Sequence, residues 1–195
     1  MPHRRIVVAV TAGMLALGLA GCGGGNAAPT TTATAQPTTS SAPAKPARPR
    51  DLDLSAVKAC DLLSAQQQAA FGIDTPPKAG RSTTFDADDC FFTAGQDRIS
   101  FFLVPITKQG IERFAPGRVN GEVRELTVSG YLAYEAWTPL APGNQFCAVH
   151  VDVADGQVLR SHYAENGRKQ PLGREELCKR AAQVAENALA TLVKK

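Results

Sequence analysis

Residues 145–163 read QFCAVHVDVADGQVLRSHY, and this stretch predicts a β-hairpin around which the rest of the domain is built. Apolar residues alternate with small or polar ones before the turn, which is the period-two pattern of a strand with one buried face. The residues predicted on that buried face are Cys147, Val149, Val151 and Val153. Asp155-Gly156 is typical of the tight turn that joins two antiparallel strands.

The hydrophobic pattern also predicts the register of the hairpin. A two-residue loop would place Val151 opposite Arg160, which pairs the apolar face with polar groups. A three-residue loop, Ala154-Asp155-Gly156, instead places Val151 opposite Leu159 and Cys147 opposite Tyr163. A slip of one residue moves every side chain to the other face of the sheet. We therefore predict the three-residue loop, with Gly156 in the left-handed conformation.

The flanking sequence predicts an α+β domain of two layers. An antiparallel sheet of five to six strands is expected from residues 89–94, 98–104, 124–128 and 131–137 together with the hairpin. Residues 124–128 and 131–137 are either two strands or one strand bent at Ser129-Gly130. Ser64 and Gln67 form a capping box for a short helix that ends at Phe71-Gly72. Another short helical stretch is expected at 108–114. Residues 174–192 predict a long closing helix, with an apolar stripe of Cys178, Ala181, Ala185, Ala188 and Leu192.

The start of the chain carries the sequence Leu19-Ala20-Gly21-Cys22 behind an uncharged run from Ile6 to Ala20. A helix that spans a bilayer needs about 20 apolar residues, so this run fits the core of a signal peptide instead. The four residues resemble the bacterial lipobox. That resemblance implies cleavage before Cys22 and a diacylglycerol thioether on its sulfur. We therefore expect a signal peptide over 1–21 and a lipid anchor on Cys22 at the extracytoplasmic face of the cell membrane.

Composition divides the rest of the chain into a tether and one domain. Residues 22–50 are rich in Thr, Pro and Ala and lack large apolar side chains, so they cannot bury enough surface to fold. Residues 51–195 are expected to form a single globular, monomeric domain. From Asp51 onward the chain has 16 basic and 18 acidic residues. A nucleic-acid-binding domain concentrates basic charge on its folded part, so we expect no nucleic-acid partner.

Four cysteines remain after Cys22, and an exported protein is expected to oxidise them to disulfides. Four cysteines allow three pairings. We favour Cys60–Cys90 and Cys147–Cys178, because each bond closes a loop of about 30 residues and joins a predicted helix to a predicted strand. Structural zinc sites use closely spaced cysteine pairs, which this sequence lacks, so no metal cofactor is expected.

The order of these parts resembles the DUF3558 family of actinobacterial lipoproteins. The resemblance rests on the lipobox, the tether, Ala59-Cys60-Asp61-Leu62-Leu63-Ser64, Asp89-Cys90-Phe91, the segment Cys147–Val151 and Cys178 in the last helix. Ala59 stands where the family usually has proline, and Phe92 keeps an aromatic residue after the second cysteine. The resemblance implies a cell-envelope location and a fold similar to the Mog1/PsbP-like α/β/α sandwich. It implies no reaction and no catalytic residues.

Two groups of residues are candidates for a ligand face. The predicted register places His150 opposite Arg160, with Asp152 two residues further along the same strand and His162 opposite Ala148. Imidazole and carboxylate groups are ligands for zinc or copper, although the simplest interpretation is a solvated or helix-edge face of the hairpin. The second group, Tyr131, Tyr134 and Trp137, is aromatic and suits either a ligand groove or the core.

The sequence contains no catalytic signature, so we expect a binding or interaction domain of the bacterial cell envelope and not an enzyme. Its partners would be the membrane, through the lipid, and either an envelope protein or a small molecule. The alternative is a metal-assisted envelope enzyme that uses His150, Asp152 and His162.

Overall fold

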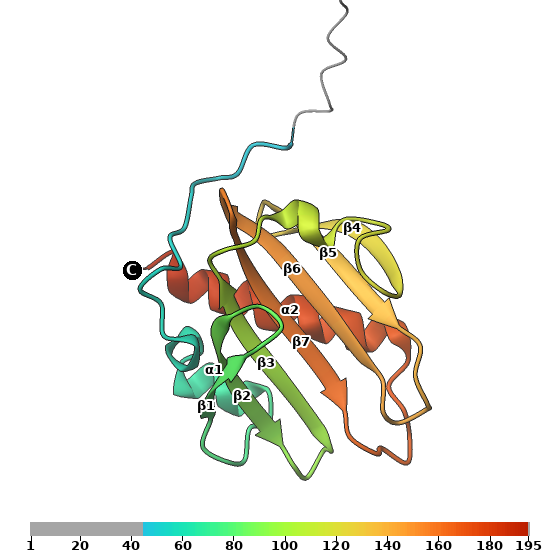
Figure 1. Cartoon of the computed structure of the whole chain (residues 1–195). Helices are drawn as coiled ribbons and strands as arrows, with labels where there is room; N and C mark the ends of the chain where they lie inside the picture. The colour runs from blue at the N-terminus through green and yellow to red at the C-terminus, as the bar shows by residue number, and fades with distance from the viewer. Residues whose placement is uncertain (1–44, 195) are drawn as a thin grey trace, which may run out of the picture. The chain divides into compact units, whose positions relative to one another are not determined.

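A seven-stranded antiparallel sheet runs through residues 45–194, the part of the chain that this computed structural model describes (Figure 1). The strand order is β1-β2-β3-β7-β6-β5-β4. The strands are β1 (Lys78–Ser82), β2 (Ala87–Ala94), β3 (Ile99–Ile106), β4 (Glu122–Val128), β5 (Tyr131–Thr138), β6 (Phe146–Ala154) and β7 (Gln157–Glu165). The predicted signal peptide and the lipidation site Cys22 lie outside the described residues.

The predicted count of five to six strands is too low, and the strand that the sequence did not indicate is β1. Its sequence, KAGRS, is polar and largely exposed, so it has neither apolar alternation nor β-branched residues. It forms because it pairs with β2, from Lys78 opposite Phe91 to Ser82 opposite Ala87. Strands β4 and β5 are separate and meet at a turn through Ser129 and Gly130, which gives the remaining six.

The hairpin of β6 and β7 has the predicted register along most of its length. Val151 lies opposite Leu159, and Cys147 lies opposite Tyr163. Near the turn the register shifts by one, so that Ala154 pairs with Gln157 and the extra residue forms a bulge. Gly156 has a φ of +69°, as predicted. The turn is therefore tighter than predicted, and the bulge restores the register that the hydrophobic face requires.

One face of the sheet is covered by helices (Figure 1). These are η1 (Ala59–Leu62), α1 (Ala65–Ala70) and α2 (Arg174–Leu192). The capping box of α1 is present, with Ser64 and Gln67 bonded to each other's backbone N–H groups. The predicted stripe of α2 is buried against the sheet, where the Ser161 hydroxyl donates to the Ala181 carbonyl at 2.7 Å. Valines 149, 151 and 153 of β6 belong to the same core.

Two disulfides join this helical layer to the sheet, in the pairs that the sequence favours. Cys60 of η1 is bonded to Cys90 of β2, and Cys147 of β6 is bonded to Cys178 of α2. Their sequence separations are 30 and 31 residues. Both bonds lie on the helical side of the sheet, within the main hydrophobic core.

The opposite face of the sheet is not fully exposed to solvent, because a second, smaller apolar cluster covers part of it. The short 3₁₀ helix η2 (Ile111–Phe114) forms only the last turn of the stretch expected at 108–114, and its Ile111 and Phe114 are buried against this face. The other buried members of this second core are Ala87, Val104, Ile106, Leu132 and Val158. The interpretation of this face as solvated is therefore wrong for His150 and Asp152, which are 3% and 1% exposed.

The layering agrees with the α+β prediction from the residues. Both α-helices within residues 45–194 lie on the same side of the sheet: α2 packs on it through the main core, and α1 is held there by Phe71 at its end, 5.5 Å from Phe101 of β3 between ring centroids, and by a bond from Gln67 to Asn187 of α2. The second face has η2 and loops, so the α/β/α sandwich implied by the resemblance is not the layering of these residues. No helix in this part of the chain is both long and apolar enough to cross a membrane.

Candidate functional site

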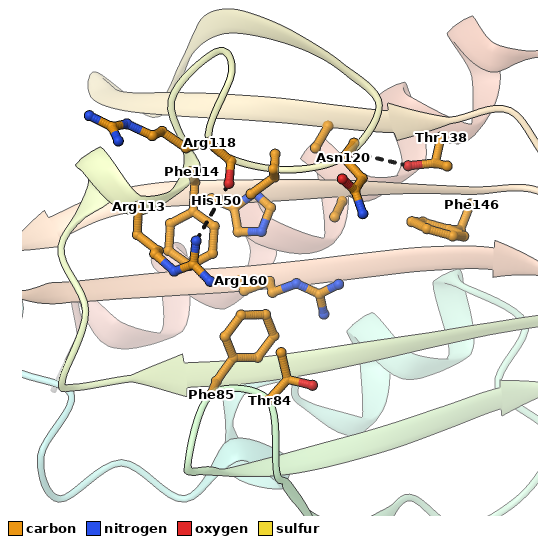
Figure 2. A pocket seen from close by; sticks show the side chains of 13 residues that line it. Thr84, Phe85, Arg113, Phe114, Arg118, Asn120, Thr138, Phe146, His150 and Arg160 are labelled. Carbon is orange, nitrogen blue, oxygen red and sulfur yellow. Dashed lines mark hydrogen bonds between the residues drawn. The ribbon is translucent and has the colours of Figure 1, made fainter. Parts of the chain in front are cut away.

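A cavity of about 430 Å³ opens on the loop-covered face of the sheet. Figure 2 shows its floor on β6 and β7 and its walls at η2, at the segment that follows η2, and at the loop between β1 and β2. Its size falls in the range of cavities that bind small molecules. The cavity lies on the side of the sheet that no α-helix of residues 45–194 covers.

The floor follows from the alternation of side chains along the hairpin. Even-numbered residues of β6 point away from the helices because the odd-numbered valines point toward them. Ala148 and His150 therefore lie under the cavity, and Arg160 of β7 is the register partner of His150. The small side chain of Ala148 leaves the space that larger residues would fill.

Aromatic rings form the apolar part of the cavity. Phe114 of η2 stacks on the His150 ring with a centroid distance of 4.1 Å. Phe85, from the loop between β1 and β2, lies 5.9 Å from Phe114 between centroids. The Arg160 guanidinium carbon lies 5.1 Å from the Phe85 centroid, a cation–π distance.

Arg160 is the most unusual polar group of the cavity. Its Nε is buried and has no hydrogen-bond partner, and no carboxylate within the described residues lies at ion-pair distance from it. Burial lowers the pKa of Arg160 to about 10, against a smaller opposing effect of Asp89. The guanidinium is therefore charged at neutral pH but poorly compensated by its surroundings.

The two histidines of this face are neutral at physiological pH. Burial, followed by the charge of Arg160, lowers the pKa of His162 to about 3. The pKa of His150 lies well below its ordinary value for the same first reason, with further lowering by Arg160 and His162. His150 Nδ1 lies 3.3 Å from the Tyr134 carbonyl. Positive charge in the cavity comes from arginines and not from imidazolium.

Comparison with known proteins assigns the family but no activity. A family model described as protein of unknown function (DUF3558) matches residues 17–191. The chain belongs to the DUF3558 family. No curated protein and no solved structure matches it. The description of the DUF3558 family names no reaction, so the function must be argued from the cavity.

The three aromatic residues predicted to form one group, Tyr131, Tyr134 and Trp137, lie on opposite faces of the sheet of this DUF3558 domain. Tyr131 and Trp137 lie on the helical side, where Tyr131 is buried and the Arg174 guanidinium lies 5.0 Å from the centroid of the Trp137 ring. Tyr134 lies on the other side, against the second core. A single groove formed by these three residues is therefore excluded, because alternate residues of β5 point to opposite faces.

The polar group is brought onto one face, but its members have different partners. His150 is stacked under Phe114, and His162 lies between Phe102 and Phe146. Asp152 accepts a hydrogen bond from Arg48 at 3.0 Å. Of the three residues that the metal alternative requires, His150 alone lines the cavity.

Among the described residues of the DUF3558 domain, one group of three metal-ligating side chains comes close together: Glu135, Cys147 and Cys178. The two cysteines are bonded to each other, so their sulfurs are not thiolate ligands. Glu135 accepts from Arg124 at 3.0 Å. This cluster is therefore a disulfide beside an ion pair.

Most of the cavity could not be predicted from the sequence. The predicted register places Arg160 opposite His150, and an arginine among apolar strand residues is the one signal that could have marked Arg160 as a site residue. Phe85, Phe114 and the rim residues come from irregular segments. Their positions depend on how those segments fold over the sheet, so no periodic pattern reveals them.

Proposed function

We propose that this protein is a lipid-anchored, extracytoplasmic binding domain of the bacterial cell envelope, and that its ligand occupies the cavity over β6 and β7. The observation that carries the proposal is the convergence of aromatic, cationic and small side chains from separate elements on one cavity of about 430 Å³. A concave site with a few polar groups among apolar walls is the usual form of a small-molecule site.

The location is supported by the sequence and by the cysteine pairs. Leu19-Ala20-Gly21-Cys22 follows a short apolar run, as in bacterial lipoproteins. The two disulfides are stable in an oxidising compartment and rare in the cytosol. Two acyl chains on one cysteine would anchor the protein durably, because a single chain gives only reversible binding.

The lining of the cavity supports binding more than catalysis. Its titratable side chains are three arginines and His150, and the His150 ring is neutral and covered by Phe114. A nucleophile needs a base within hydrogen-bond reach. The Thr138 hydroxyl instead donates to the Asn120 carbonyl at 3.3 Å.

Fractionation of cells tests the anchor. The full chain, expressed in a bacterium that processes lipoproteins, should sediment with membranes, and mass spectrometry should find acylated Cys22 as the mature N-terminus. Cys22→Ser should release the protein into the soluble extracytoplasmic fraction. An uncleaved leader with an unmodified Cys22 sulfur would show that the anchor is wrongly assigned.

Native mass spectrometry tests the cavity. The full chain, purified from membranes in mild detergent, should carry a non-covalent adduct of small-molecule mass. Ala148→Phe fills the floor of the cavity and should remove the adduct, whereas Ala182→Phe on the helical side should retain it. An adduct of equal occupancy in both variants, or none in the wild type, contradicts a ligand in this cavity.

A further inference from the structure

We infer that the ligand is a small organic anion, whose carboxylate or phosphate group binds the Arg160 guanidinium while its apolar part contacts Phe85 and Phe114. This inference rests on the proposed function and adds the chemical class of the ligand. It concerns a free small molecule or the headgroup of a lipid, which carry the same anionic chemistry.

The first support is the absence of carboxylates from a cavity that contains arginines. Arg113, Arg118 and Arg160 line it, and none of them forms an ion pair among residues 45–194, whereas most arginines elsewhere in that range do. The paired arginines are Arg48, Arg81, Arg124, Arg168, Arg174 and Arg180. Clustering of uncompensated positive charge is unexpected in a domain with more acidic than basic residues.

The second support is the Nε atom of Arg160, which has no hydrogen-bond acceptor. Arg160 is half-buried, and its Nε is fully buried. A buried donor left unsatisfied costs about 1–3 kcal/mol, a cost that natural proteins retain mainly where function requires it. The carboxylate that raises the pKa of Arg160 is Asp89, which acts through space and forms no ion pair with Arg160 among the described residues. An anionic ligand would supply the missing acceptor, and the planar guanidinium suits the two oxygens of a carboxylate or phosphate.

The surroundings of Arg160 provide further donors. Figure 2 shows its guanidinium directed into the cavity, with the side chains of Thr84 and Asn120 on either side in this view, and both residues line the same cavity. A hydroxyl and an amide can each donate to an anionic oxygen. Arg113 donates to the Arg118 carbonyl at 3.4 Å, and this pair adds positive charge along the η2 side.

The aromatic walls indicate that the anion is organic. Phe114 stacks on His150, which also lines the cavity, and Phe85 lies near both Phe114 and the Arg160 guanidinium. Val119 extends this apolar wall. A volume of about 430 Å³ is far larger than an inorganic phosphate requires. A flat or compact apolar group attached to the anion would fill the remaining space.

Calorimetry with simple probes tests the class of ligand on the full chain, after removal of any co-purified molecule by dialysis. Phenyl phosphate and benzoate should bind more tightly than benzyl alcohol, which lacks the charge, and more tightly than inorganic phosphate, which lacks the ring. Arg160→Met should weaken phenyl phosphate binding about 10- to 100-fold, as expected for a lost charge-assisted hydrogen bond. Equal affinity for phenyl phosphate and benzyl alcohol, or no binding of any probe at 10 mM, would overturn the inference.

A second measurement does not depend on the probe. In the absence of ligand, Arg160→Met should raise the melting temperature, because it removes a half-buried charge whose buried Nε has no acceptor and keeps a side chain of similar volume. Arg180→Met, which removes the same charge from the helical side, should leave both the melting temperature and phenyl phosphate binding nearly unchanged. A fall in the melting temperature of Arg160→Met would show that the guanidinium is structural and would overturn the inference.

Two further outcomes separate this inference from the proposed function. A neutral molecule identified in the native adduct would refute the anion but retain a binding domain. Vesicles of phosphatidylglycerol that compete with phenyl phosphate would place the anion on a lipid, and vesicles that do not compete would place it on a free molecule; either result supports the anionic class.

Discussion

Arg48 is a single residue that fixes the start of the folded domain. Its guanidinium donates to Asp152 at 3.0 Å and to Asp155 and Asp51 at 2.7 Å each. The Asp152 side chain is 1% exposed, whereas that of Asp155 is 93% exposed. The sequence assigned Arg48 to the tether, since nothing in the composition around it distinguishes a residue that pairs with a carboxylate more than 100 positions away.

Substitution of Arg48 should therefore lower the free energy of unfolding, mainly because Asp152 loses its partner. Arg48→Met leaves a buried carboxylate without its main partner and should lower the free energy of unfolding by about 3 kcal/mol. Asp155→Asn removes an exposed partner of the same arginine and should cost less than about 0.5 kcal/mol. Urea denaturation measures both. Equal losses in the two variants would mean that burial of Asp152 does not control the effect.

The two histidines of the sheet, buried His150 and half-buried His162, make stability depend on pH. The folded-state pKa of His162 is about 3, below the value of 6.5 for the unfolded chain, so the unfolded state binds an extra proton as the pH falls below 6.5. Stability is therefore highest above pH 6.5 and falls between pH 6.5 and about 3. From pH 7 to pH 5 the loss should be about 2 kcal/mol for this group.

His162→Phe tests that dependence, because phenylalanine keeps an aromatic ring between Phe102 and Phe146 and cannot titrate. Urea denaturation at pH 7 and pH 5 should show a smaller difference for the variant than for the wild type, by about 2 kcal/mol. His150 should account for part of the loss that remains. Parallel pH profiles for the variant and the wild type would show that His162 is not the titrating group.

At the scale of elements, the sequence predicts those with a strong periodic pattern. The hairpin, α2 and the capping box of α1 were predicted because apolar spacing or local hydrogen-bonding residues define them. Strand β1 was not, because its polar residues acquire strand conformation only through pairing with β2. Strand pairing between distant segments is tertiary information that local propensity does not contain.

The disulfides allow the two faces to be tested separately. Replacing Cys60 and Cys90 by alanine, or Cys147 and Cys178, should lower the free energy of unfolding by about 3.5–4 kcal/mol per pair, since each bond closes a loop of about 30 residues. Neither replacement should alter phenyl phosphate affinity at a temperature where the variant is folded, because both bonds lie on the helical side. Urea denaturation and calorimetry measure the two effects. A variant that remains folded but binds several-fold more weakly would show that the faces are coupled.

At the scale of the whole molecule, the two layers were predictable and the cavity was not. Period-two strands and a long amphipathic helix are sufficient to indicate a sheet covered on one side. The cavity depends on η2, on the segment between η2 and β4, and on the loop that carries Phe85. Those segments have no periodicity, so the sequence locates the floor residues His150 and Arg160 without indicating what lies above them.

The placement of both crosslinks on the helical side of the sheet separates stability from ligand binding. The two disulfides join η1 and α2 to the sheet on the helical side. None of the residues that line the cavity is a cysteine of these bonds. Replacing Arg160 or Phe85 would thus change what the pocket accepts without loosening the scaffold. The fold therefore separates the covalent framework from the residues that line the cavity, and we expect stability and ligand binding to respond to different substitutions.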